Sequence, residues 1–224
     1  MNKLDYKKDF KNLYLPPAEP VLVNVPPALY AVVDGQGNPN DSPVFQAAIE
    51  ALYSISYGIK MSPKKGIQPK GYYQYTVFPL EGLWDMSPNP GALEAVKVRE
   101  SAEVDRPRPL LDKDRFVWRL MIRQPDFVTQ DFFDIVKDFS AKKKEAPDLS
   151  SVKLETIADG LSVQMMHVGT FDSEPASFAK MDEFCASEGL VRIGHNHREI
   201  YLSDPRRTSP EKLKTVLRYF VTKT

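Results

Sequence analysis

The chain has 224 residues, of which 42% are hydrophobic and 27% are charged, a composition typical of folded globular proteins. Its 30 Lys and Arg residues balance 30 Asp and Glu residues, so it lacks the positive surplus that favours phosphate binding, and we expect no nucleic-acid partner. A single cysteine excludes an internal disulfide, and no apolar stretch approaches the ~20 residues that span a bilayer. Residues 1–11 lack the apolar core of a secretory signal. The sequence therefore predicts a cytoplasmic protein without membrane contact.

The first half of the chain reads as strand, helix, strand, strand. Residues 1–20 are charged and then proline-rich, and we expect a loosely packed arm before a domain over 21–224. Residues 28–33 have the β-branched content of a strand, and Asp41-Ser42-Pro43 is typical of a helix start. Strands over 72–78 and 115–122 would complete a first half of about 21–125. The proline-containing connection between them, 79–114, is long enough for a binding loop or a lid, and the sequence leaves this open.

The second half repeats this order of elements. An amphipathic helix over 130–139 lies in a linker of about 127–145. Within a second half of about 150–222, we expect a strand over 161–168, a helix over 175–187, and strands over 198–202 and 213–221. The repeat indicates an α+β fold built by internal duplication.

Two motifs in the second half resemble a known family. The segment from His197 to Arg207, followed by 210–218, is similar to the closing signature of GyrI-like proteins. His167-Val168-Gly169-Thr170-Phe171 is similar to the family's glycine-turn motif, with Thr170 where proline is common. The resemblance implies duplicated strand-helix-strand-strand modules with pseudo-twofold symmetry, around a central cleft for large, flat, often cationic organic molecules. Relatives include effector domains of multidrug-responsive regulators, an inhibitor of DNA gyrase, and hydrolases of cyclopropane-bearing natural products that alkylate DNA.

The closing motif contains the main candidate site residue, Glu199. Strand alternation places His197, Glu199 and Tyr201 on one face and Ile200 on the other. A carboxylate beside an aromatic ring can hold an aromatic cation by charge and stacking. A solvated glutamate on an exposed face is the alternative, but Glu199 matches the family's cleft glutamate.

Further residues are candidates for the walls of the cleft, with ordinary core packing as the alternative for each. Trp84 stands among loop-forming residues, which favours a cleft role. Methionines repack around varied ligands, although they are more often core residues. The candidate ligand-binding residues beside Glu199 are Tyr201, Trp84, Tyr73, Tyr75, Trp118, Phe116, His167 and Met165.

The sequence predicts no metal site and no cofactor. His195 and His197 are two residues apart, but the segment supplies no obvious third ligand. Cys185 lies on the apolar face of a predicted helix without a basic neighbour, so it is not a candidate nucleophile. Gly35 and Gly37 form a Gly-x-Gly turn without the rest of a dinucleotide fingerprint.

Three functions remain open. The first is a receptor or sequestering protein for aromatic, often cationic, small molecules, with Glu199 as the charge partner. The second is a hydrolase that adds water to a strained cyclopropane ring, with Glu199 as the base, alone or with Glu155 or Glu81. The third is an inhibitor that acts through a protein partner, as the gyrase-binding relative does.

Overall fold

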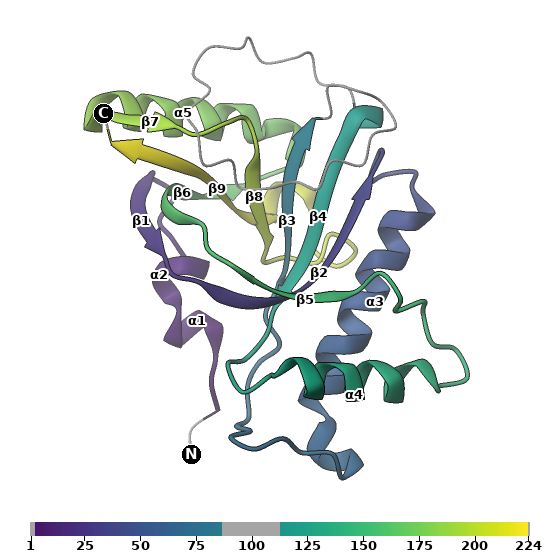
Figure 1. Ribbon diagram of the computed structural model, residues 1–224. Helices are drawn as coiled ribbons and strands as arrows, with labels where there is room; N and C mark the ends of the chain where they lie inside the picture. Colours follow the sequence, from purple (N-terminus) through teal and green to yellow (C-terminus); the bar gives the residue numbers. More distant parts are fainter. Residues whose placement is uncertain (1–2, 87–112, 224) are drawn as a thin grey trace.

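The computed structural model describes residues 3–86 and 113–223 (Figure 1). Its helices are α1 (Tyr6–Asp9), α2 (Lys11–Tyr14), α3 (Pro43–Lys60), α4 (Gln130–Ala141) and α5 (Glu174–Glu188). Its strands are β1 (Val21–Val25), β2 (Ala28–Gln36), β3 (Leu80–Met86), β4 (Phe116–Arg123), β5 (Lys153–Ile157), β6 (Gly160–Val168), β7 (Leu190–Arg192), β8 (His197–Tyr201) and β9 (Lys214–Lys223). Short 3-10 turns are η1 (Ser62–Lys65), η2 (Lys113–Arg115), η3 (Phe171–Ser173) and η4 (Pro210–Lys212). The α+β fold predicted from the sequence is confirmed.

The strands form one antiparallel sheet in the order β1-β6-β9-β8-β3-β4-β2-β5, with β7 paired to β9. From the centre outward, β3-β4-β2-β5 on one side corresponds to β8-β9-β6-β1 on the other. Val25 pairs with Gly160 and Ala28 pairs with Ile157, so the register continues from β1 into β2 and from β5 into β6. The segment β1-β2 and the segment β5-β6 thus cross each other and link the two ends of the sheet, as the lower part of Figure 1 shows. This arrangement is consistent with two duplicated modules.

Cross-strand pairing shows that α3 and α5 cover the same face of the sheet. One row of paired residues crosses six strands, and side chains directly opposite each other in an antiparallel pair share a face. Its outer members pack with α5 at one end and with α3 at the other. The row consists of Met165, Leu217, Glu199, Gly82, Leu120 and Val33. Glu199 and Gly82 therefore lie at the centre of the sheet, between the two helices.

Local sequence signals explain where these two helices begin and end. The Ser42 hydroxyl accepts a hydrogen bond from the Phe45 amide at 3.2 Å, and Pro43 occupies the first turn of α3. Helix α5 ends at Gly189, whose φ of 64° lies in the left-handed region that favours glycine. Helix α4 packs across α3 (Figure 1).

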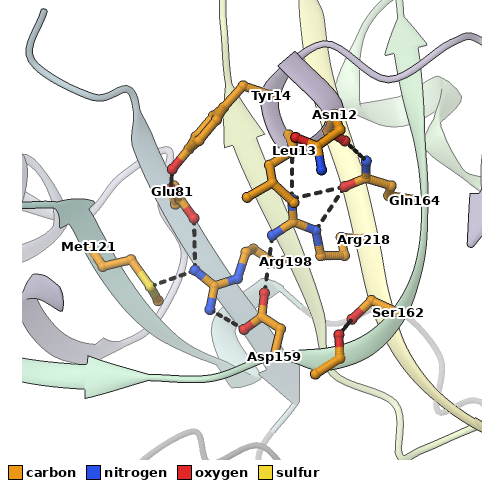
Figure 2. A network of polar contacts seen from close by, with 11 residues as sticks. Asn12, Leu13, Tyr14, Glu81, Met121, Asp159, Ser162, Gln164, Arg198 and Arg218 are labelled. Atoms are coloured by element: carbon orange, nitrogen blue, oxygen red, sulfur yellow. Dashed lines mark hydrogen bonds and ion pairs between the residues drawn. The ribbon is translucent and has the colours of Figure 1, made fainter. Parts of the chain in front are cut away.

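The opposite face of the sheet holds a buried network of charges (Figure 2). Arg198 donates one hydrogen bond to Glu81 at 2.7 Å and another to Asp159 at 2.5 Å. Asp159 also accepts a hydrogen bond from Arg218, whose guanidinium further donates to the Gln164 amide oxygen. The two arginines are balanced by the two carboxylates, so this network leaves no net charge inside the fold.

The expectation of a loosely packed arm over residues 1–20 is wrong. Tyr6, Leu13 and Tyr14 are buried, and the Tyr14 hydroxyl donates a hydrogen bond to Glu81 at 3.0 Å. Arg218 donates to the backbone carbonyl of Leu13. The segment is ordered because its aromatic residues pack against Phe78 and its backbone completes the buried network.

One predicted strand is also misplaced. Residues 72–78 form only an isolated bridge from Tyr75 to Leu4, and the third strand of the first half is β3 instead. Tyr72, Tyr73 and Tyr75 each contact Phe127, so this aromatic content reflects packing on the α4 side rather than a sheet position. The predicted connection 79–114 thus contains β3 and η2, and its middle, 87–112, lies outside the described residues. No helix in the described ranges is long and apolar enough to cross a membrane.

Candidate functional site

A cavity of about 1640 Å³ opens between α3 and α5 on the central strands of the sheet. Phe45 and Tyr53 line it from α3, Trp84 from β3, and Phe116 from β4. Across from them, Phe178 of α5 and residues of β8 form the second wall. The cavity is therefore concave and rich in aromatic surface, which is typical of sites for small organic molecules.

A chain of hydrogen bonds leads to Glu199 on this wall. The Trp84 indole N–H donates to the Tyr201 hydroxyl at 2.8 Å, and Tyr201 is hydrogen-bonded to the Glu199 carboxylate. His197 Nε2 lies 3.0 Å from Glu199 Oε1. Burial, followed by the charge of Glu199 and the hydrogen bond to it, raises the pKa of Tyr201 well above its usual value. Tyr201 therefore keeps its proton and can donate a hydrogen bond to the Glu199 carboxyl group.

A second carboxyl group, Glu174, lies beside Glu199 at the start of α5. Its side chain lines the cavity, yet the residue is only 7% exposed, compared with 8% for Glu199. Burial, followed by the negative charges of Glu199 and Asp172, raises the pKa of Glu174 well above its ordinary range. Glu174 is thus the group that holds a proton at neutral pH.

Four of the residues proposed from the sequence come together in this cavity: Glu199, Tyr201, Trp84 and Phe116. Trp84 and Phe116 contact each other edge to face, with ring centroids 5.6 Å apart. Trp84 reaches the cavity from a strand rather than from the loop expected for it. The role of these four residues in ligand binding stays a prediction.

The other proposed residues lie outside the cavity lining. The Tyr73 hydroxyl donates to Asp126, and Tyr75 is 1% exposed beneath α3. Trp118 is fully buried across from Gly35, with its ring edge-on to Phe45. His167 contacts Ser177 and Thr170 through its two ring nitrogens, and Met165 packs in the core under α5. Packing and internal hydrogen bonds account for the positions of these five residues.

The two alternative partners considered for Glu199 also lie elsewhere. Glu81 is on the opposite face, bound to Arg198 and Tyr14. Glu155 of β5 pairs with Arg119 at 2.9 Å. The carboxyl group that does accompany Glu199, Glu174, was not a sequence candidate, because a glutamate before a helix proline ordinarily reads as a helix start.

Glu174, His197 and Glu199 offer oxygen and nitrogen atoms that all lie within 4.8 Å of one another. Such a cluster could hold a positively charged group, whether an inorganic or an organic cation. The sequence-based expectation of no metal considered only histidine and cysteine spacing, and it stays a prediction.

The fold and the cavity together define a small-molecule-binding α+β domain. Residues 18–219 match the model of the GyrI-like small molecule binding domain, and the chain belongs to this family. No curated protein matches the chain.

Solved structures similar to this chain support the same fold. A hydrolase from Listeria innocua is 38% identical, with a TM-score of 0.84, and the match covers 98% of this chain and 100% of that chain. A hydrolase encoded by lin2189 from the same organism is 39% identical, with a TM-score of 0.84, and covers 99% of this chain and 100% of that chain. The EcmrR C-terminal domain, at 12% identity and a TM-score of 0.50, covers 95% of this chain and 99% of that one and shows the fold alone.

Proposed function

We propose that the protein binds flat aromatic molecules in this cavity and that Glu199 faces the positively charged or polarised part of the ligand. The observation that carries the proposal is a carboxylate, only 8% exposed, on the wall of an aromatic-lined cavity. A buried carboxylate is costly without a partner, and an aromatic cation supplies both charge and a ring that can stack. The family match supports small-molecule binding in general.

The shape of the cavity supports a large ligand rather than a metabolite of a few atoms. Drug-sized pockets usually measure about 300–1,000 Å³, and this cavity is larger. Phe45 and Trp84, with ring centroids 5.8 Å apart, stand on one side of it. Phe178 stands on the other side, edge-on to His197 at 4.9 Å. Aromatic side chains on two sides favour a planar molecule between them.

A second candidate function is hydrolysis of a strained ring in such a ligand. It is favoured by the second carboxyl group, Glu174, beside Glu199, whose raised pKa keeps it protonated, and by the hydrolase names of the two Listeria innocua structures. In this reaction, Glu199 takes a proton from water while the water oxygen bonds to a cyclopropane carbon. The ring C–C bond breaks, and the electron pair released into the ligand takes up a proton, so that one water is added in total.

One experiment tests both candidates. The purified protein is incubated with a panel of flat aromatic compounds, some cationic and some bearing a cyclopropane, and both binding and product mass are measured. Retention of unchanged compound supports the receptor, whereas a mass gain of one water supports the hydrolase. If no compound is bound or converted, the proposed function is wrong.

The Glu199→Gln variant separates the two roles of this residue. If Glu199 is a charge partner, the variant should lose on the order of 1–3 kcal/mol of affinity for cationic aromatic compounds and little for neutral ones. If Glu199 is a base, turnover of a neutral cyclopropane compound should fall by about a hundredfold or more while its binding is spared. Glu183→Gln, an exposed position on α5, is the matched control and should change neither quantity.

A further inference from the structure

The Glu174–Glu199 pair contains an acceptor atom that nothing in the described part of the chain satisfies. Glu174 Oε1 is buried and has no hydrogen-bond partner there, although the residue as a whole is 7% exposed. The carboxylate of Glu199, by contrast, is hydrogen-bonded to Tyr201 and lies against His197. Buried acceptors are normally satisfied, so an orphaned one in a ligand cavity points to a donor that arrives with the ligand.

The surroundings of this atom specify what the donor must carry. The two buried carboxyl groups offer oxygen atoms within 4.8 Å of each other, which disfavours a second negative charge, and a cation between them removes that conflict. Glu174 is the first residue of the 15-residue helix α5, whose positive end also favours its ionised form once a cation is present. The ligand group must therefore be both positively charged and able to donate hydrogen bonds.

We propose that Glu174 and Glu199 together select ligands whose positive charge is carried by a planar group with N–H donors, such as an aromatic amidinium. This inference rests on the proposed binding function and names its ligand class. A quaternary ammonium group supplies charge without an N–H, and a neutral amide supplies N–H without charge. An amidinium supplies both the charge and the N–H donors. Its two NH2 groups can each donate to one of the two carboxyl groups.

Three probes on the same naphthalene ring test this proposal: 2-naphthamidine, the trimethyl-2-naphthylammonium ion and 2-naphthamide. The full chain, treated with a chelator so that no metal occupies the pair, is titrated with each probe by calorimetry. The amidine should bind at least about tenfold more tightly than either of the others, as expected for a charge-assisted hydrogen bond to a buried acceptor.

Two substitutions assign this preference to the pair. In Glu174→Leu, which removes the acceptor oxygen, the advantage of the amidine over the trimethylammonium probe should largely disappear, whereas trimethylammonium binding changes by less than about threefold. In Glu199→Gln, both cations should bind more weakly, because the variant removes the ionised carboxylate. Glu174→Gln, which keeps an acceptor oxygen but cannot ionise, should retain only part of the advantage, and Glu183→Gln is again the control.

The outcomes separate this proposal from the function on which it rests. If the wild type binds both cations equally well, or if Glu174→Leu keeps the preference for the amidine or Glu174→Gln keeps it in full, the ligand class is wrong while small-molecule binding stands. If none of the probes and none of the aromatic panel binds, both proposals are wrong.

Discussion

Gly82 on β3 lies directly opposite Glu199 on β8, and the absence of a side chain there leaves room for the neighbours of Glu199. A Cβ on Gly82 would stand 2.6 Å from the Trp84 indole nitrogen and 3.0 Å from the Tyr201 hydroxyl. These are the two atoms joined by the 2.8 Å hydrogen bond. Glycine at this position therefore permits the contact that orients Tyr201 towards the Glu199 carboxylate.

We expect Gly82→Ala to damage the site more than the fold. The added methyl group displaces Trp84 or Tyr201, so affinity for any aromatic ligand of the cavity should fall about tenfold, with a stability loss of about 1–3 kcal/mol from overpacking. Fluorescence titration and urea denaturation measure the two effects. Adding Tyr201→Phe, which removes the crowded hydroxyl, should recover part of the stability. Unchanged binding in Gly82→Ala would contradict this account of the site.

Gly35→Ala should act in the opposite way, on the fold rather than on the cavity. A Cβ on Gly35 would meet the Trp118 ring at 2.1 Å, and this ring is fully buried between β4 and α3. A rigid indole cannot give way there, so we expect a loss of about 3 kcal/mol or more in the free energy of unfolding. Urea denaturation checks this. Replacing Trp118 by Leu in the same chain should offset part of the loss, and additive effects of the two substitutions would refute the proposed clash.

The buried network on the other face should be far more sensitive than a surface ion pair. Asp159→Asn removes the carboxylate that pairs with both Arg198 and Arg218 and leaves a buried positive charge uncompensated. We expect a loss of about 3–5 kcal/mol in the free energy of unfolding. Asp204→Asn removes the partner of Arg206, whose side chain is 84% exposed, and should leave stability nearly unchanged. Chemical denaturation of both variants gives the comparison. Equal losses of stability in the two variants would show that burial does not make the network more sensitive than a surface ion pair.

Much of the fold could be predicted because most elements carry a local signal. The β-branched run at the start of β2 and the serine cap of α3 act within a few residues, so the sequence shows them directly. Strand β3 was missed because Gly82 and Asp85 interrupt its strand pattern. Strands β1 and β5 were missed because their pairing depends on a crossing of distant segments.

The candidate site was only partly predictable, for a related reason. Glu199 and Tyr201 lie on one strand, where alternation alone places them on one face. Glu174 is on another element, and only the packing of α5 against the sheet brings it to Glu199. Buried aromatic residues such as Trp118 cannot be distinguished from cavity residues by composition, because both occupy apolar surroundings.

The raised pKa of Glu174 predicts how stability depends on pH in the ligand-free protein. Below the ordinary glutamate pKa, the folded and unfolded chains both hold this proton, and the contribution of Glu174 to stability is fully present. As the pH rises above that value, the unfolded chain releases the proton while the folded chain keeps it, so the free energy of unfolding falls until the folded pKa is reached. The slope from this one group can approach about 1.4 kcal/mol per pH unit.

The variant Glu174→Gln is neutral at every pH and should lack this decline. Between pH 5 and pH 8, the difference in the free energy of unfolding, variant minus wild type, should therefore increase by about 2 kcal/mol or more. Urea denaturation across this range measures the difference, with Glu183→Gln, exposed on the same helix, expected to follow the wild type. Parallel profiles for wild type and Glu174→Gln would show that Glu174 ionises freely in the folded protein, and the picture of a protonated carboxyl beside Glu199 would then be wrong.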